Sequence, residues 1–78
     1  MTDTKLLDEK IKASGVKVSF LSEQLGLSRQ GFYKKKDNPN AKWRGAEIYV
    51  IKDVLRLSEM DAHKIFYPQS TPSGVLDK

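Results

Sequence analysis

Apolar residues along this chain recur three and four positions apart, the spacing that gives a helix one buried face. The first such group ends at Ser14-Gly15, where Gly15 predicts a left-handed helix end. Its apolar members are Leu6, Leu7 and Ile11. Three residues are suitable N-caps for this helix, and the pattern does not decide among them: Thr2, Asp3 and Thr4.

The stretch LSEQLGLSRQGFYKKK, residues 21–36, has a helical apolar pattern on both sides of Gly26. One continuous helix would place Gly26 in its interior at a cost of about 1 kcal/mol relative to Ala, with a similar cost at Gly31. A break at Gly26 removes the first cost, because Gly adopts the left-handed conformation that ends a helix sharply. Ser28 then serves as the N-cap of the following helix.

Two short helices are therefore predicted in place of one long helix. The first begins near Ser19, a suitable N-cap, and ends at the glycine. It turns Leu21 and Leu25 toward the core, with Phe20 beside them. The second spans about residues 29–36 and carries three lysines at its end.

The sequence Asp37-Asn38-Pro39-Asn40 is dense in turn residues, and Pro39 prevents the third helix from continuing. A fourth helix is expected over roughly residues 44–55. Its apolar stripe consists of Ile48, Ile51 and Leu55. This segment is rich in β-branched residues, but its spacing of three and four suits a helix better than a strand.

Ser58-Glu59-Met60-Asp61 resembles a capping box with Asp in place of Glu, and it predicts a fifth helix through about Tyr67, ended by Pro68. The remaining residues, 69–78, have turn formers and little apolar content, so we expect a flexible C-terminal tail. The fold class expected is therefore all-α, with five short helices in a domain of residues 1–68.

The chain of 78 residues has room for a modest core and little room for an enclosed enzyme pocket. It has no Cys and a single His, so neither a disulfide nor a metal site is expected. No apolar run approaches the roughly 18 residues of a membrane span, and the start of the chain does not resemble a signal peptide. We therefore expect a cytoplasmic protein. No catalytic triad, P-loop or dinucleotide motif is present, so no enzyme activity, cofactor or small-molecule ligand is expected.

Basic residues are concentrated in one part of the chain. Between residues 29 and 44, six Lys and Arg side chains stand against the single acid Asp37, a local charge of +5 in a chain whose total is +4. Such a concentration on a small domain favours a polyanionic partner, although a run of lysines is also found on ordinary solvated surfaces.

The stretch from Val18 to about Lys35 is similar to the helix-turn-helix of the phage Cro and repressor family. The matching positions are the apolar Leu21, the small Ser22, the apolar Leu25, the turn glycine Gly26, the apolar Leu27 and then Ser28-Arg29-Gln30-Gly31-Phe32. The resemblance extends more loosely to the other three helices. It implies a lambda repressor-like DNA-binding domain, and the small Cro-like regulators of Gram-positive phages or prophages look most similar.

The sequence departs from the family pattern at three positions. Ser22 replaces the usual Ala where the two helices pack closely, and Phe32 replaces an aliphatic residue that buries the second helix of the motif. Lys35 stands where the family usually has another apolar residue. Its alkyl stem can lie across the gap with the ammonium in solvent, but this helix end is then less firmly seated.

If the third helix enters the major groove as the recognition helix, the residues near its N-terminus come closest to base edges. Arg29 suits a bidentate contact with guanine and Gln30 one with adenine. Tyr33 and Lys34 follow one turn later on or near the same face, and Gly31 leaves no side chain to hold the helix off the DNA. Simpler readings remain open: solvated Arg29 and Gln30, and Tyr33 packed on the core edge.

Eight residues are candidates for contacts with the DNA backbone: Lys17, Ser19, Ser28, Lys35, Lys36, Lys42, Trp43 and Arg44. The N–H groups near Ser28 can receive a phosphate at the start of a helix. The resemblance implies such contacts at the start of the second helix and in the loop before the fourth. Two alternatives are open for Trp43: its indole N–H donates to a phosphate, or its ring packs over the helix junction.

The leading interpretation is a sequence-specific regulator of transcription that occupies operator sites in double-stranded DNA. One recognition helix reads only a few base pairs, so a homodimer on DNA is expected. The alternative is a protein-interaction module, such as an antitoxin or an antirepressor partner, that keeps the fold without the DNA function. The sequence leaves open the operator, activation versus repression, and whether the chain is the DNA-binding end of a longer repressor.

Overall fold

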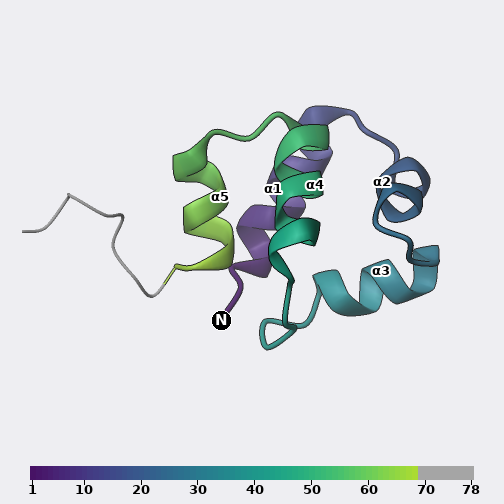
Figure 1. Ribbon diagram of the computed structural model, residues 1–78, viewed down its shortest axis with the longest axis horizontal. Coiled ribbons are helices and arrows are strands. Elements are labelled where there is room, and N and C mark those ends of the chain that lie inside the picture. Colours follow the sequence, from purple (N-terminus) through teal and green to yellow (C-terminus); the bar gives the residue numbers. More distant parts are fainter. Residues whose placement is uncertain (69–78) are drawn as a thin grey trace, which may run out of the picture.

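The computed structural model describes residues 1–68, and five helices follow one another in this part of the chain (Figure 1). They are α1 (Thr4–Ser14), α2 (Val18–Gln24), α3 (Arg29–Lys36), α4 (Gly45–Leu55) and α5 (Glu59–Phe66). The described residues contain no strand, so the prediction of an all-α fold with five helices is confirmed. The tail expected at residues 69–78 lies outside the described residues.

The helices are arranged around a central pair. Figure 1 shows α1 and α4 next to each other, with α5 on one flank and with α2 and α3 on the other. α3 runs along the lower edge, where it contacts both α1 and α2. The connection from α3 to α4 also lies at this edge, so the basic segment of the sequence is gathered on one side of the molecule.

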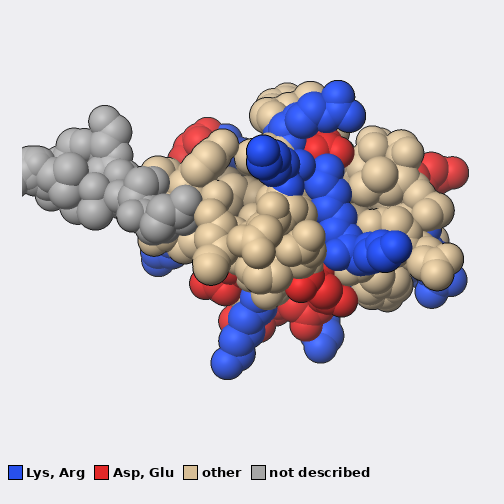
Figure 2. All heavy atoms as spheres, turned by 90° about the horizontal axis from the view of Figure 1, so that it is seen from below, with Lys and Arg blue, Asp and Glu red and all other residues tan. Residues whose placement is uncertain are grey.

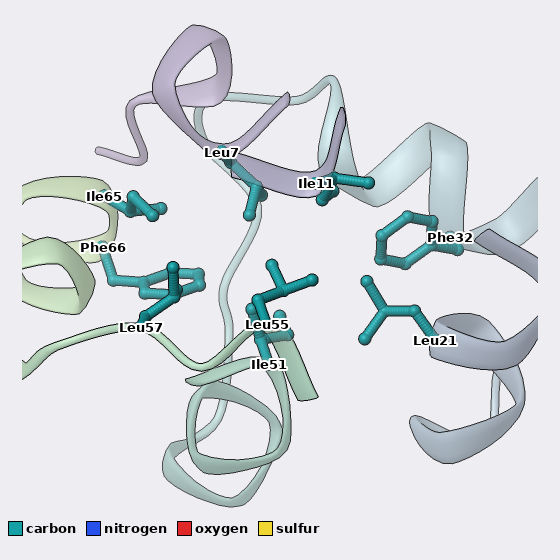
Figure 3. Packing of buried hydrophobic residues seen from close by; sticks show 9 residues of the cluster. All are labelled: Leu7, Ile11, Leu21, Phe32, Ile51, Leu55, Leu57, Ile65 and Phe66. Atoms are coloured by element: carbon teal, nitrogen blue, oxygen red, sulfur yellow. The ribbon is translucent and has the colours of Figure 1, made fainter. Parts of the chain in front are cut away.

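One apolar cluster holds all five helices together. Figure 3 shows its nine residues: Leu7, Ile11, Leu21, Phe32, Ile51, Leu55, Leu57, Ile65 and Phe66. α2 and α3 each contribute one of them, Leu21 and Phe32, and both side chains are fully buried. Leu21 and Phe32 are therefore the main apolar attachments of these two short helices to the core, and Val18 of α2 packs against the cluster beside them.

The structure settles the helix ends that the sequence left open. Asp3 is the N-cap of α1, because its Oδ1 accepts a hydrogen bond from the Leu6 N–H at 3.0 Å. Gly15 ends α1 with a φ of 74°. Ser58 caps α5 by accepting from the Asp61 N–H at 3.0 Å, as the sequence predicts.

Two details of α2 differ from the prediction. The helix begins at Val18 and its N-cap is Lys17, so the choice of Ser19 as the cap was wrong. Lys17 makes no side-chain hydrogen bond to the helix start, and its extended backbone alone leads into the first turn. Phe20 was expected near the inner face, but 48% of its surface is exposed.

The first residues of the chain tie this lower edge to α5. The Thr2 N–H donates to the Pro39 carbonyl at 2.8 Å, and the Asp3 N–H donates to the Ile65 carbonyl at 2.7 Å. These bonds fix the turn after α3 against the rest of the molecule. The longest described helices have 11 residues, far fewer than the roughly 20 that a helix needs to cross a bilayer.

Candidate nucleic-acid interface

The turn between α2 and α3 fixes how the two helices meet. Gly26 has a φ of 72°, and its N–H donates to the Glu23 carbonyl at 3.0 Å. The Leu27 N–H donates to the Ser22 carbonyl at 2.9 Å. This pair of bonds around a left-handed residue is the Schellman motif, which ends a helix and reverses the chain sharply. The predicted break at Gly26 is therefore confirmed.

α3 starts immediately after this turn and is capped by Ser28, whose Oγ accepts from the Gly31 N–H at 2.9 Å. A Cβ at Gly31 would lie 3.0 Å from that Oγ, so the glycine also makes room for the cap. The helix buries Phe32 completely on its inner side. Its predicted span and cap are both confirmed.

The four residues predicted to contact bases are all exposed on α3: Arg29, Gln30, Tyr33 and Lys34. Arg29 and Tyr33 stand four residues apart, as do Gln30 and Lys34, so the two pairs form neighbouring rows on the outer face. Tyr33 is 41% exposed and its ring centroid lies 6.2 Å from that of Phe32. It therefore touches the core edge and still presents a surface to solvent.

Five of the eight candidates for backbone contact are exposed: Lys17, Ser19, Ser28, Lys42 and Arg44. They lie at the start of α2, at the start of α3 and directly before α4. The other three are engaged inside the molecule, each in a different way.

Lys35 is held by an ion pair. Its Nζ lies 2.9 Å and 3.1 Å from the two carboxylate oxygens of Glu47 and 4.7 Å from the centroid of the Trp43 ring. The side chain is 24% exposed, so the stem covers the core edge while the ammonium is neutralised by an acid.

Lys36 is buried more deeply, with only 6% of its side chain exposed. Its Nζ donates to Asp37 at 2.8 Å and to Asp8 at 3.0 Å. Burial works to lower the pKa of Lys36, but the hydrogen bonds to Asp37 and Asp8 outweigh it and raise that pKa. The sequence singled out Lys35 as the lysine in a core-like position, whereas Lys36 is the buried one. Its ammonium faces α1, so a phosphate contact has no support in its placement.

Trp43 packs between Phe32 and Phe66, with ring centroids 6.4 Å and 5.9 Å away in edge-on arrangements. Its Nε1 is buried and has no hydrogen-bond partner among the described residues. Of the two readings open for Trp43, packing over the helix junction is therefore confirmed. The indole N–H points into the molecule rather than toward a phosphate.

Figure 2 views the molecule from the side of α3 and the connection to α4. Lys and Arg side chains form a band across this face, with an acidic side chain among them, and other acidic side chains gather toward the lower edge. The face is thus basic but interrupted.

Glu47 was not identified from the sequence. It is the third residue of α4, and its Oε1 accepts from the backbone N–H of the N-cap Arg44 at 2.9 Å. Burial works to raise the pKa of Glu47, but the Arg44 N–H and the Lys35 ammonium outweigh it and lower that pKa. A Glu three residues after a helix start is a capping signal that could have been found in the sequence. Its pairing with Lys35 could not.

Comparison of the chain with protein-family models, with curated proteins and with solved structures gave no match.

Proposed function

We propose that α2 and α3 form a helix-turn-helix and that the protein is a Cro-like regulator of transcription. In this proposal α3 is the recognition helix and enters the major groove of operator DNA. Arg29, Gln30, Tyr33 and Lys34 face base edges, while the exposed side chains at the starts of α2 and α4 contact phosphates.

The observation that carries the proposal is the orientation of α3. A tight turn at Gly26 and the fully buried Phe32 hold one side of the helix against the core. The opposite side presents two cations, an amide and a phenol in adjacent rows. Arg and Gln are the side chains best suited to bidentate contacts with guanine and adenine. Figure 2 shows a band of Lys and Arg side chains on the side of α3, and cations in such a band can neutralise phosphates.

A homodimer on DNA is part of the proposal. A recognition helix of eight residues reaches only a few base pairs, so affinity of regulatory strength needs two half-sites. Exposed aromatic residues outside α3, Tyr49 on α4 at 68% and Tyr67 just after α5 at 48%, offer apolar surface for subunit contact.

The proposal is tested by selecting duplexes from a random pool with the purified protein. We expect an enriched motif with two inverted half-sites about one helical turn apart. In mobility-shift assays, log K should fall by roughly 0.9 per phosphate contact for each unit of log salt. Binding that depends on salt but shows no preference over scrambled duplex would contradict the proposal.

Two variants locate the contact on α3. Arg29→Glu and Lys34→Glu should each weaken binding to the selected duplex about tenfold or more, because a base contact is worth about 1–3 kcal/mol. Lys64→Glu, on exposed surface of α5, makes the same charge change on the far flank of the molecule and should have a much smaller effect. Equal losses in all three variants would point to general attraction rather than to a recognition helix.

The alternative is a protein-interaction module that keeps the fold. The same exposed Tyr49 and Tyr67 favour it, because aromatic side chains are enriched at protein interfaces. Charge reversal at Arg29 and Lys34 separates the two functions, since a module that binds through α4 and α5 would be indifferent to it.

A further inference from the structure

Glu47 is an acid in a place where DNA binding would favour a neutral or basic residue. It lies in the first turn of α4, three residues after Arg44 and beside Lys35, and only 11% of its side chain is exposed. A carboxylate among side chains that approach phosphates repels the DNA. Gln at this position could accept the same hydrogen bond from the Arg44 N–H without the charge.

The Glu47 carboxylate joins α3, which is proposed to face base edges, to the start of α4, which is proposed to contact phosphates. Its Oε1 accepts from the Lys35 ammonium and from the Arg44 backbone N–H, both at 2.9 Å, and its Oε2 accepts from Lys35 at 3.1 Å. Lys35 is in the last turn of α3, and Arg44 is the N-cap of α4. Glu47 therefore links the end of α3 directly to the start of α4.

This link has a mechanical consequence for a short helix. α3 is anchored to the core mainly by Phe32, and its N-terminal end is fixed by the Gly26 turn. The position of its C-terminal end depends on the two lysine ion pairs and on the Thr2–Pro39 bond that fixes the following turn, and Lys35 also lies over the Trp43 ring. The Glu47 link joins this end of α3 to the start of α4, so its loss loosens α3 relative to the exposed cations before α4.

We propose that Glu47 is a positioning residue for DNA binding, which holds α3 in register with the backbone-contacting residues Lys42 and Arg44 through Lys35. This inference rests on the proposed function of α3. The negative charge of Glu47 lowers the overall attraction of the protein to DNA. Its positioning role raises the discrimination between sequences, because base contacts form only when the phosphate contacts place the helix correctly.

The Glu47→Gln variant separates the two effects. It removes one negative charge from the face, so affinity for any duplex should rise through electrostatics. It also weakens the link to Lys35, so the contacts that depend on register should weaken. We therefore measure the ratio of affinities for a duplex selected by the wild-type protein and a scrambled duplex of equal length. This ratio does not depend on the folded fraction of the variant, because unfolding lowers both affinities equally.

For Glu47→Gln we expect the ratio to fall roughly 3- to 30-fold, which lies within the range of coupling energies between neighbouring residues, while affinity for the scrambled duplex rises. Glu9→Gln makes the same charge change on exposed surface of α1 and should leave the ratio unchanged. An unchanged ratio in Glu47→Gln, with both affinities raised by one factor, would reduce Glu47 to a source of repulsion and overturn the inference.

A double-mutant cycle tests whether Glu47 acts through Lys35. Lys35→Met keeps a stem of similar length without the ammonium, and it should lower the ratio by a similar factor. The double variant should be no worse than either single variant. If its loss equals the product of the single losses, the two residues act independently and the inference fails. If the wild-type protein itself shows no sequence preference, the proposed function fails. This result is distinct from an unchanged ratio in Glu47→Gln and from independent losses in the double variant, which overturn only the role of Glu47.

Discussion

Gly26 and Arg56 hold the same left-handed backbone conformation at two helix ends, with φ values of 72° and 55°. Both residues are followed by a leucine whose N–H bonds back into the preceding helix, at Ser22 and Lys52 respectively. For Gly this conformation is free of steric cost, whereas for Arg it costs roughly 1–2 kcal/mol because the Cβ crowds the following carbonyl.

Opposite substitutions at these two positions should therefore have opposite effects on stability. Gly26→Ala should lower the free energy of unfolding by about 1 kcal/mol, and the loss comes from the backbone alone because an added Cβ meets nothing within 4 Å. Arg56→Gly should raise it by up to about 1 kcal/mol, since relief of strain exceeds the extra chain entropy of Gly. Urea unfolding measures both changes, and a loss of stability in Arg56→Gly would contradict this account.

At the scale of elements, α3 is tied to two different neighbours through adjacent lysines. Lys35 pairs with Glu47 on α4, and Lys36 pairs with Asp8 on α1. Asp8 also pairs with Lys12 one turn further along α1, at 3.0 Å. The hydrogen bond from Lys36, and then that from Lys12, lowers the pKa of Asp8. The run of lysines is thus a set of inter-helix links as much as a charged surface.

These links predict a pH dependence of stability. The folded pKa values of Asp8 and Glu47 lie below their ordinary values. The stabilising contribution of these two carboxylates is therefore fully present above their ordinary pKa values and is lost as the pH falls through the lowered folded pKa values. The pKa of Lys36 is raised, so its contribution is present at neutral pH and is lost only in strong alkali. Stability should therefore be level near neutral pH and decline below about pH 5.

The Asp8→Asn variant tests the predicted decline of stability at acid pH. Because this variant lacks the titrating carboxylate, its free energy of unfolding should fall less steeply between about pH 5 and pH 3 than that of the wild-type protein. Glu9→Gln, at the exposed neighbouring position, is the control for removal of one carboxylate from α1. An equally steep fall of the free energy of unfolding at acid pH in the wild-type protein and in Asp8→Asn would show that the α1–α3 link does not contribute to this pH dependence.

At the scale of the whole molecule, one apolar cluster receives side chains from every helix, and Trp43 lies at the junction of α3, α4 and α5. No helix has a separate core of its own among the described residues. Loss of any helix therefore exposes part of the same cluster, which favours a single cooperative unfolding transition.

The only tryptophan reports on this transition directly. Trp43 fluorescence and far-UV circular dichroism should give coincident urea unfolding curves, because the indole leaves Phe32 and Phe66 only when the core opens. Binding of the selected duplex should leave Trp43 emission nearly unchanged, since the ring packs inside and does not stack on DNA. A fluorescence transition at lower urea than the loss of helix would show that the junction opens before the domain.

The sequence alone determined the five helices, the break at Gly26, the cap at Ser28 and the burial of Phe32. Each of these depends on interactions within one or two turns: a left-handed glycine, a cap three residues from its donor, and a helical apolar period. Where a cap was chosen wrongly, at Ser19, the error was two residues.

The tertiary structure decided which charged residues face solvent and which face the protein. Lys35 and Glu47 are 12 residues apart, and Lys36 and Asp8 are 28 apart, so no local pattern reveals these pairs. The six lysines and arginines of the basic segment are alike in sequence, yet four are exposed interface candidates and two are internal links, according to the side of α3 or of the α4 start that they occupy. The burial of the Trp43 indole and the pairing of Glu47 with Lys35 were likewise decided by the tertiary structure, because both depend on elements that meet only when the core is assembled.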